Sequence, residues 1–427
     1  MRVAVIGSGA AGLCALRLLK EHPRGFHPVG FELSAEVGGT WNYTDKTGTD
    51  ERGLPVQSSM YKNLRTNLPK EIMAFPDFPF DSSLPSFIQH TDVAEYLRRY
   101  AQHFDLYKFI KFKTLVEHVS PVCQPNNTSA IKWNVTYSAA DNRNEQTTEE
   151  FESVIVCNGH YSTPLIPDTP GLDVFEGEVL HSHNYRTPSA FRGRKVVLLG
   201  AGASGQDISI DVSSEAKEVF LSSRKAPLQC QLPENVHLVP GIKHLKEKSV
   251  VFENDQETTI DSLLFCTGYK YTFPFLDPKI GVKVDEDQRI TPLYKHLVHS
   301  KFPSLFLIGF CKTVCPFPQF HVQTSTVMSI LSGKVQLPSR QEMEKDEADD
   351  LAARMARGLP RRHAHEMGPH QWEYNAQLAQ LGGFQDPIPV SVKNIYDYVH
   401  RTRVKNLIGY KKEKYTRVGN DISHVAA

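Results

Sequence analysis

The chain has 427 residues, 40% of them hydrophobic, and its 48 Lys and Arg residues balance its 48 Asp and Glu residues. This length favours two domains, each large enough to bury its own core. The balanced charge argues against nucleic acid as a partner, because nucleic-acid-binding proteins concentrate positive charge on one face. Seven cysteines, an odd number scattered along the chain, form no disulfide framework and favour a reducing compartment.

The sequence shows no sign of a membrane segment or a leader. No apolar run approaches the ~20 residues that a membrane helix needs. The N-terminus enters an apolar strand at once, which leaves no room for a signal peptide. We therefore expect a cytoplasmic or otherwise soluble protein, secreted only if a leader has been removed.

A glycine-rich turn near the N-terminus predicts a first β-α-β unit. An apolar strand over Val3–Ile6 precedes the turn, a helix is expected from Ala10 to Lys20, and a second strand from Pro28 to Leu33. The turn consists of Gly7, Ser8, Gly9, Ala10, Ala11 and Gly12. In such a turn the helix N-terminus binds a pyrophosphate. Glu32 stands twenty residues past the last glycine, where a carboxylate accepts hydrogen bonds from two ribose hydroxyls.

The region after this unit is expected to contain a loop, a helix and a set of strands. The proline-rich passage from Phe75 to Phe87 cannot form a regular helix. Apolar spacing predicts a helix over Asp92–Phe104, and residues 109–156 are expected to form paired strands. The segment Pro164–Pro170 is typical of a linker.

A second glycine-rich turn predicts a second β-α-β unit, over Lys195–Arg224. The turn consists of Gly200, Ala201, Gly202, Ala203, Ser204 and Gly205. Arg224 stands nineteen residues past the last glycine of this turn, preceded by Ser223, where an acid is expected. A guanidinium at this point forks onto a 2′-phosphate. The two turns therefore predict that a flavin dinucleotide and NADPH are held together; the alternative, two glycine turns without ligand, is disfavoured because each follows a strand and opens a helix.

The last third of the chain carries weaker signals. A strand over Phe302–Gly309 is expected to rejoin the first domain. Ser339 and Glu342 have the spacing of a capping box and predict a charged, solvent-facing helix. Residues 360–427 either cap the active site or form a subunit interface, and a homodimer would be the commonest symmetric assembly.

Several motifs together resemble the flavin-containing monooxygenases. Phe175–Tyr185 matches the F-x-G-x-x-x-H-x-x-x-[F/Y] signature of that family. Further similar segments are Gly38–Trp41, Thr66–Met73, Ser204–Asp207 and Cys266–Tyr269. The resemblance extends from residue 1 to about residue 340. The chain lacks the long hydrophobic C-terminal anchor of the vertebrate microsomal members, which favours a soluble, short form.

The resemblance implies an α/β fold with two Rossmann-like dinucleotide-binding domains. An FAD-binding domain would be made of residues 1–168 and 291–427, and an NADPH-binding domain of residues 169–290 would be inserted between its two segments. His181 and Tyr185 of the signature would shape the linker between the domains.

The resemblance also implies roles for single residues. Thr40 and Trp41 would lie along the flavin, and Asn67, the candidate catalytic residue, would lie between flavin and nicotinamide. An Asn amide can donate to a peroxide oxygen without ionising; the alternative is an Asn that satisfies a loop turn. The other implied cofactor contacts are Glu32, Gly39, Thr66, Val116, Gln206, Asp207, Ser223 and Arg224.

The implied reaction begins with hydride transfer from NADPH to FAD. The reduced flavin would react with O₂ to give a C4a-hydroperoxyflavin, and a small nucleophilic amine or sulfide would take the distal oxygen. Because the cofactor supplies this chemistry, the sequence needs no catalytic acid, Ser-His-Asp set or metal cluster. The motifs leave the substrate open, including the choice between N- and S-oxygenation.

Two other FAD- and NADPH-dependent activities compete with this interpretation. A Baeyer–Villiger monooxygenase, acting on ketones, shares both turns, but its signature ends in Trp where Tyr185 stands. A dithiol reductase needs a closely spaced cysteine pair, whereas Cys311 and Cys315 have neither required spacing and are expected to be packing cysteines.

A non-enzymatic metal protein is the alternative from a different class. It is suggested by His363, His365 and His370, but Gly368 and Pro369 interrupt the regular geometry and no carboxylate pair completes the set. A solvated loop rich in histidine and arginine is the preferred interpretation, so no metal site is expected.

Overall fold

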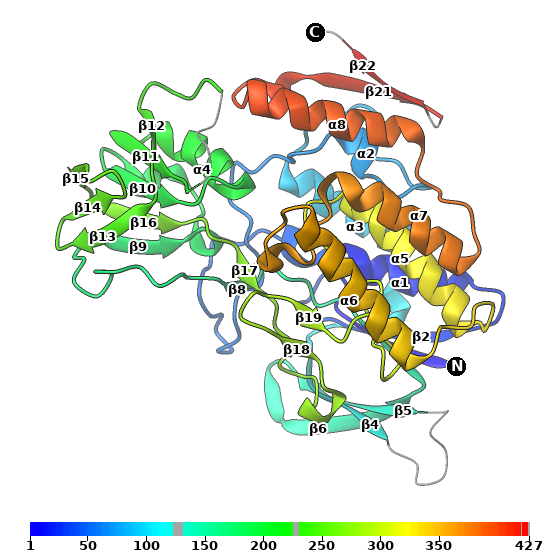
Figure 1. Ribbon diagram of the computed structural model, residues 1–427. Coiled ribbons are helices and arrows are strands. Elements are labelled where there is room, and N and C mark those ends of the chain that lie inside the picture. Colours follow the sequence, from blue (N-terminus) through cyan, green and yellow to red (C-terminus); the bar gives the residue numbers. More distant parts are fainter. Residues whose placement is uncertain (123–130, 225–229, 420, 426–427) are drawn as a thin grey trace.

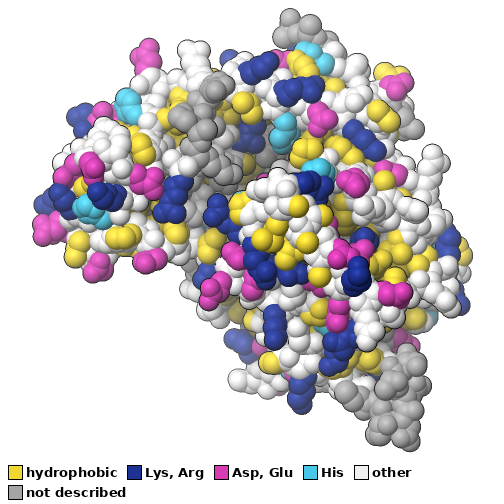
Figure 2. All heavy atoms as spheres, in the orientation of Figure 1, with side chains coloured by type: hydrophobic (Ala, Val, Ile, Leu, Met, Phe, Trp, Pro, Cys, Tyr) yellow, Lys and Arg dark blue, Asp and Glu magenta, His cyan; other side chains and the backbone are white. Residues whose placement is uncertain are grey.

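The computed structural model describes residues 1–122, 131–224, 230–419 and 421–425 (Figure 1). Two parallel sheets stand side by side, and several helices pack on the first one. The end of the chain forms a long helix and a hairpin that lie across the top of the molecule. On the face seen in Figure 2, Lys and Arg side chains are interspersed with Asp and Glu side chains, in agreement with the balanced charge of the sequence.

The first sheet is parallel and is built from both ends of the chain. Its strand order is β20-β7-β1-β2-β3. The strands are β1 Arg2–Ile6, β2 His27–Phe31, β3 Ile110–Lys111, β7 Ser153–Val156 and β20 Leu305–Leu307. Helix α1, Ala10–Glu21, connects β1 to β2 and packs against α3, His90–His103, and α5, Pro316–Leu331. The four buried residues of β1, Val3–Ile6, place this strand at the centre of the core.

The second sheet repeats the same design with a shorter stretch of chain. Its strand order is β12-β11-β10-β16-β9, all parallel. The strands are β9 Glu178–His181, β10 Lys195–Leu199, β11 Glu218–Ser222, β12 Val236–Val239 and β16 Ser262–Phe265. Helix α4, Ala203–Ser213, connects β10 to β11. Because β9 to β16 all lie between β7 and β20 in the chain, the second unit is inserted into the first, which confirms the predicted fold class.

Antiparallel sheets flank the two parallel ones. Beside the first sheet lie β4 Thr114–Val122, β5 Lys132–Ala139 and β6 Asn142–Phe151, and beside the second lie β13 Ile242–Lys246, β14 Ser249–Phe252 and β15 Glu257–Thr259. The paired strands predicted within residues 109–156 are therefore confirmed. Apolar residues of β4–β6, including Trp133 and Phe151, share a buried cluster with Phe31 of β2.

The chain crosses between the two units twice, and the crossings run side by side. The outgoing crossing contains β8, Thr163–Pro164, and the returning one contains β17, Tyr269–Lys270; these short strands pair antiparallel. After the return, β18 Lys283–Val284 and β19 Ile290–Thr291 form a further small pair. The predicted linker thus begins within a short strand that ties the crossings together.

The remaining helices confirm the local predictions. Residues between α2, Lys70–Met73, and α3 form no helix, as the prolines predicted. Ser339 caps α6, Arg340–Ala356, and its backbone N–H donates to Glu342 at 2.8 Å, so the capping box is formed. Helix α7, Gln371–Gly382, packs on α5.

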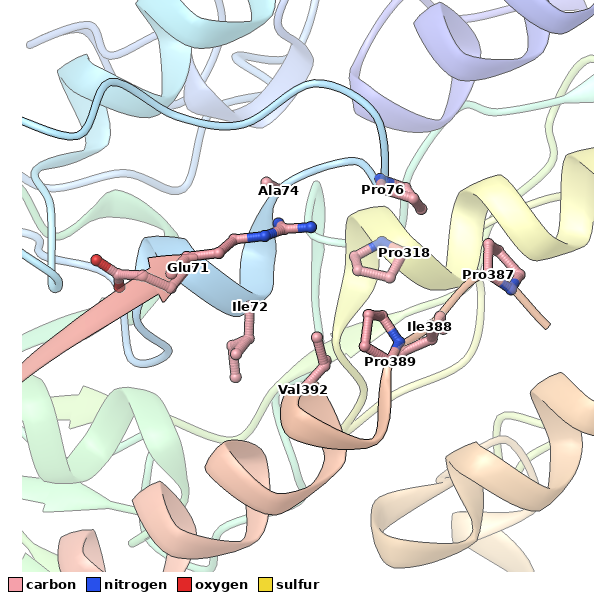
Figure 3. Close-up of a pocket in the computed structure, with 10 residues that line it drawn as sticks. Glu71, Ile72, Ala74, Pro76, Pro318, Pro387, Ile388, Pro389 and Val392 are labelled. Atoms are coloured by element: carbon pink, nitrogen blue, oxygen red, sulfur yellow. The ribbon is translucent and has the colours of Figure 1, made fainter. Parts of the chain in front are cut away.

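The C-terminal segment forms α8, Val390–Lys405, and a hairpin of β21, Lys414–Val418, and β22, Asp421–Val425. In Figure 1 this segment, in red, lies across the top of the molecule, over α2. Figure 3 shows the hollow where Pro389 and Val392, at the start of α8, face Ile72 of α2 and Pro318 of α5. Among the residues that the structure describes, none of the helices combines the length and apolar composition of a membrane span.

Candidate functional site

The first glycine-rich turn is a cradle that only glycines can form. It lies at the carboxyl edge of β1, and the turn leads directly into α1. Gly7 has φ +98°, and a Cβ added there would lie 2.5 Å from the Cys157 carbonyl oxygen. A Cβ on Gly12 would lie 1.8 Å from the carbonyl oxygen of Gly7. The helix and the strand therefore approach as closely as this dinucleotide fingerprint requires.

The second turn has the same geometry. Gly200 has φ +110°, and an added Cβ would lie 2.6 Å from the Cys266 carbonyl oxygen. A Cβ on Gly205 would lie 1.8 Å from the Gly200 carbonyl oxygen, the same distance as in the first turn. At Gly202, an added Cβ would meet no atom of the described residues within 4 Å. The backbone here borders open space, which leaves room for a phosphate at the N-terminus of α4.

Glu32 lies directly after β2 and next to the first cradle. Its carboxylate accepts hydrogen bonds from the backbone N–H of Ser8 at 2.7 Å and from the backbone and hydroxyl of Ser34 at 2.9 and 2.8 Å. Burial raises the pKa of this carboxyl, and the donors from Ser34 and Ser8 oppose the rise. Both lone pairs of Oε1 are used by Ser34, whereas Oε2, which accepts only from Ser8 among the described residues, keeps one lone pair for a ribose hydroxyl.

The segment with Gly39, Thr40 and Trp41 lies against the first cradle. It forms a short 3₁₀ turn over Gly39–Trp41, and a Cβ on Gly39 would lie 3.1 Å from the Cα of Gly9. Thr40 is half-buried, with its hydroxyl 3.4 Å from that of Ser59. The structure thus brings together three of the predicted cofactor contacts.

Thr66 and Asn67 are neighbours with different surroundings. Thr66 is buried, and its hydroxyl accepts a hydrogen bond from the backbone N–H of Ile88 at 3.1 Å. Asn67 is exposed, and its amide has no hydrogen-bond partner among the described residues. Thr66 therefore anchors the loop, and Asn67 presents a free amide.

Val116, in β4, is buried in the core beside the first sheet.

Gln206 and Asp207, in the first turns of α4, are already engaged by protein groups. The amide of Gln206 donates to the Ala201 carbonyl at 2.9 Å and accepts from Arg403 at 2.8 Å. The carboxylate of Asp207 accepts from Lys411 at 2.6 Å and also from the Tyr61 hydroxyl. Ser204, by contrast, is exposed at the start of the helix.

Ser223 and Arg224 follow β11 at the carboxyl edge of the second sheet. The backbone N–H of Ser223 donates to the Val239 carbonyl at 3.1 Å, which continues the sheet pairing. The Arg224 side chain is 76% exposed and lies 3.6 Å from the carboxylate of Glu253. An exposed guanidinium in a long ion pair is available to an incoming phosphate.

The signature segment includes β9, at the edge of the second sheet, and its side chains bond groups of the second unit. The imidazole of His181 bonds the Gly268 carbonyl at 3.0 Å and accepts from the backbone N–H of His183 at 3.0 Å. The hydroxyl of Tyr185 donates to Asp211 of α4 at 2.6 Å. His181 thus bonds the start of the returning crossing, whereas Tyr185 bonds a helix of the second unit.

Sequence reasoning missed the residue directly after the signature, Arg186. Its buried guanidinium donates to five carbonyl oxygens at 2.6 to 3.1 Å. These carbonyls belong to Thr44, Lys46, Ser58, His183 and Tyr185. Burial lowers its pKa. Arg186 thus fastens the loop beyond Trp41 to the linker; a basic residue adjoining the signature was the only available signal.

The cysteines and histidines give no second site. Cys311 and Cys315 are buried, and burial raises the pKa of Cys311 to about 12, so both are the packing cysteines predicted. The described residues contain no group of three metal-ligating side chains. The solvated-loop prediction was wrong for His365, which is buried and accepts from the Ile290 N–H at 2.8 Å, because α6 and β19 cover this part of the loop.

These features define an α/β protein with two glycine-rich turns of the dinucleotide-binding type. The chain matches the sequence profile of the family described as flavin-binding monooxygenase-like over residues 1–232 and 228–383. It therefore belongs to this family of flavin-containing monooxygenases and is an enzyme.

Individual proteins similar to this chain support the same family assignment. The chain is 39% identical over 401 residues to flavin-containing monooxygenase FMO GS-OX-like 2 of Arabidopsis thaliana, covering 88% of this chain and 84% of that protein. Among solved structures, S-allyl-L-cysteine S-oxygenase from Allium sativum superposes with a TM-score of 0.88 at 35% identity, covering 97% of this chain and 95% of that one. Tmm from Pelagibacter sp. strain HTCC7211 has a TM-score of 0.87 at 27% identity, covering 100% and 96%.

Proposed function

We propose that this chain is an NADPH-dependent flavin monooxygenase that transfers one oxygen atom from O₂ to sulfur or nitrogen of a small molecule. The observation that carries the proposal is the pair of equivalent glycine cradles, one followed by buried Glu32 and the other by exposed Arg224. Glu32 favours a dinucleotide whose adenosine ribose has free hydroxyls, and Arg224 favours one whose adenosine ribose carries a 2′-phosphate.

FAD is the flavin proposed for the first cradle. The turn from Gly7 to Gly12 would hold its pyrophosphate at the N-terminus of α1, and Glu32 would accept from its adenosine ribose. Thr40 and Trp41 adjoin this cradle and would contact the flavin. The proposed FAD domain comprises residues 1–168 and 291–427, which together supply every strand of the first sheet.

NADPH is proposed for the second cradle, in residues 169–290. Gly202 borders open space at the N-terminus of α4, and Ser223 and Arg224 stand at the adjoining strand end. A guanidinium forms paired, charge-assisted bonds to the 2′-phosphate of NADPH, which NADH lacks. Arg224 would therefore distinguish NADPH from NADH.

Asn67 is the proposed catalytic residue. When bound, the flavin would accept hydride from NADPH and activate O₂ for transfer of one oxygen atom. The exposed amide of Asn67 would donate a hydrogen bond to that oxygen. An amide stays neutral while it donates, so it stabilises developing charge without transferring a proton.

A thioether is the first substrate class to test. S-allyl-L-cysteine S-oxygenase is 35% identical over almost the whole chain, and its name specifies oxygen transfer to sulfur. A tertiary amine is the second class, since its nitrogen lone pair is a comparable nucleophile. A ketone is the third class, since the signature ends in Tyr185 where that of the Baeyer–Villiger enzymes ends in Trp.

The proposal is tested with purified full-length protein. The released flavin would be identified by mass spectrometry, and NADPH and O₂ consumption would be followed with a thioether, a tertiary amine and a cyclic ketone. Under ¹⁸O₂ we expect one labelled oxygen in the sulfoxide or N-oxide. Exclusive formation of a lactone from the ketone would replace the proposal with the Baeyer–Villiger activity, and a protein that binds no flavin would refute both.

A further inference from the structure

One lysine in the C-terminal segment contacts both units at once. The ammonium of Lys411 lies 2.6 Å from the carboxylate of Asp207, in α4 of the second unit. The same ammonium donates to the backbone carbonyl of Arg65, in the first unit, at 3.2 Å. The Lys411 side chain is only 14% exposed, and burial lowers its pKa.

The first-unit side of this contact adjoins Asn67. Arg65 returns the bond, since its guanidinium donates to the Lys411 carbonyl at 3.2 Å and also to the Phe87 carbonyl at 2.7 Å. The ring of Tyr410 is buried against that of Phe87, with the centroids 5.3 Å apart. The C-terminal segment therefore fixes the backbone two residues before Asn67.

The second-unit side of the contact is the helix that opens at the NADPH cradle. Besides Lys411, the C-terminal segment contributes Arg403, which donates to the Gln206 side chain at 2.8 Å. Gln206 in turn donates to the carbonyl of Ala201, within the glycine-rich turn. In Figure 1 the C-terminal end of α8 points toward α4.

First-unit residues bond the same helix from the loop before Asn67. The hydroxyl of Tyr61 donates to Asp207, and the amide of Asn63 donates to Asp211 at 2.9 Å. Helix α4 is therefore gripped along one side by the loop at 61–65 and by the C-terminal segment. Its orientation relative to the first unit depends on these polar contacts.

We propose that Lys411, supported by Arg403, is a positioning residue for hydride transfer. By joining Asp207 of α4 to the backbone beside Asn67, it would set where the nicotinamide ring meets the flavin. This inference rests on the proposed function. It also assigns a role to a segment near the C-terminus, at 403–411, which carries none of the sequence motifs.

Contribution to stability alone is the competing explanation. Hydride transfer depends steeply on geometry, and a misplacement of 1 Å can cost about 100-fold in rate. A positioning role therefore predicts a loss in the limiting rate of flavin reduction that exceeds any loss in NADPH affinity or melting temperature.

The test compares Lys411→Met with Lys411→Arg and with Lys412→Met, the same substitution at the exposed neighbouring lysine. Anaerobic stopped-flow bleaching of the flavin absorbance gives the limiting reduction rate and the apparent Kd for NADPH. We expect Lys411→Met to lower the rate at least ~10-fold and to change Kd less than ~3-fold. Lys411→Arg should restore much of the rate, Lys412→Met should match the wild type, and dithionite should reduce all variants equally.

Hydrogen–deuterium exchange of the nucleotide-free, flavin-loaded protein supplies a readout independent of catalysis. In Lys411→Met, amides of both 61–67 and 203–211 should exchange faster, whereas those of β5 should not change. Equal reduction rates in Lys411→Met and Lys412→Met, or unchanged exchange in the two segments, would overturn the inference. Should Lys411→Met fail to fold, Asp207→Asn is subjected to the same comparison.

Failure of the proposed function would be seen separately. It would appear as wild-type protein whose flavin is not reduced by NADPH at all. In that case the exchange measurement alone decides whether Lys411 couples the two segments.

Discussion

The two glycine cradles have the same backbone and different surroundings. In both, a Cβ on the third glycine would lie 1.8 Å from the carbonyl oxygen of the first. The first cradle is packed in, since Ser8 and Ala10 are buried and Gly9 lies against Gly39. The second is open, with exposed residues over 202–204. A packed cradle suits a cofactor that stays bound, and an open one suits a dinucleotide that enters and leaves with each turnover.

Glu32 and Arg224, which follow the two cradles, also differ in burial: the residue after the first cradle is buried and the one after the second is exposed. Glu32 is buried and accepts three hydrogen bonds from the protein, so its position is fixed before any ligand binds. Arg224 is exposed, and among the described residues it makes one long ion pair, with Glu253. The carboxylate beside the first cradle is thus held by the protein itself, whereas we propose that the second cradle relies on contacts from elsewhere, including those of Lys411 and Arg403 with α4.

The largest effects are expected from a matched pair of substitutions, one in each cradle. Gly12→Ala and Gly205→Ala each place a Cβ against a backbone carbonyl that cannot move freely. We expect Gly12→Ala to abolish flavin binding and Gly205→Ala to keep the flavin but lose its reduction by NADPH. The flavin-to-protein absorbance ratio and anaerobic bleaching measure the two outcomes. Loss of flavin from both variants would mean that the cradles are not functionally distinct.

The next largest effect is expected at Asn67, the proposed catalytic residue. Asn67→Leu removes the exposed amide without changing a buried contact, so folding and flavin content should be preserved. Removal of one positioned donor typically costs about 100-fold or more in rate. Product formation should therefore fall about 100-fold, while NADPH oxidation continues and releases hydrogen peroxide. Unchanged product yield per NADPH would contradict the catalytic role.

Arg224→Ala should affect only one of the two dinucleotides. Hydrogen bonds to charged groups contribute about 1.5–3 kcal/mol, so NADPH affinity should weaken about 10- to 100-fold. NADH affinity and flavin content should remain as in the wild type. Arg192→Ala, which removes another exposed arginine of the same unit, serves as the control. A similar loss for NADPH and NADH would show that Arg224 does not read the 2′-phosphate.

The comparison also explains what could be predicted from the sequence. Both cradles, their strands and their helices were predicted correctly because glycine turns, strand periodicity and caps are local signals. Glu32 and Arg224 could be named as candidate cofactor contacts because each stands at a fixed distance from its turn. The sequence does not show which of Thr66 and Asn67 is bonded within the protein and which is exposed. Only the hydrogen bond from the Ile88 N–H shows that Thr66 anchors the loop.

The long-range contacts could not be predicted. Lys411 meets Arg65 across 346 residues, and Arg403 meets Gln206 across 197 residues. An ordinary lysine or arginine gives no local pattern that reveals such a partner. The same limit explains His365, which accepts a hydrogen bond from the Ile290 N–H, 75 residues away in the chain.

The smallest expected effect lies outside both cradles, in a buried chain of side chains. His365 accepts from the Ile290 N–H through Nε2, so its Nδ1 carries the proton and donates to His296 Nδ1 at 2.9 Å. His296 Nε2 in turn lies 3.2 Å from Asp350. Charged groups that also lie around His365 are Lys312, Arg354 and Arg289, the last paired with Glu347.

Burial, aided by these cations, lowers the pKa of His365 well below its ordinary value of 6.5. The unfolded chain therefore binds a proton that the folded chain excludes, so the stabilisation is complete above about pH 6.5 and declines as the pH falls below it. One such proton changes the free energy of unfolding by up to about 1.4 kcal/mol per pH unit. His365→Gln should flatten the decline in melting temperature between pH 7 and pH 5, whereas His370→Gln, at an exposed site, should leave it unchanged. If His365→Gln keeps the wild-type slope, acid sensitivity arises elsewhere, and any pH effect on the two cradles must be measured at each cradle directly.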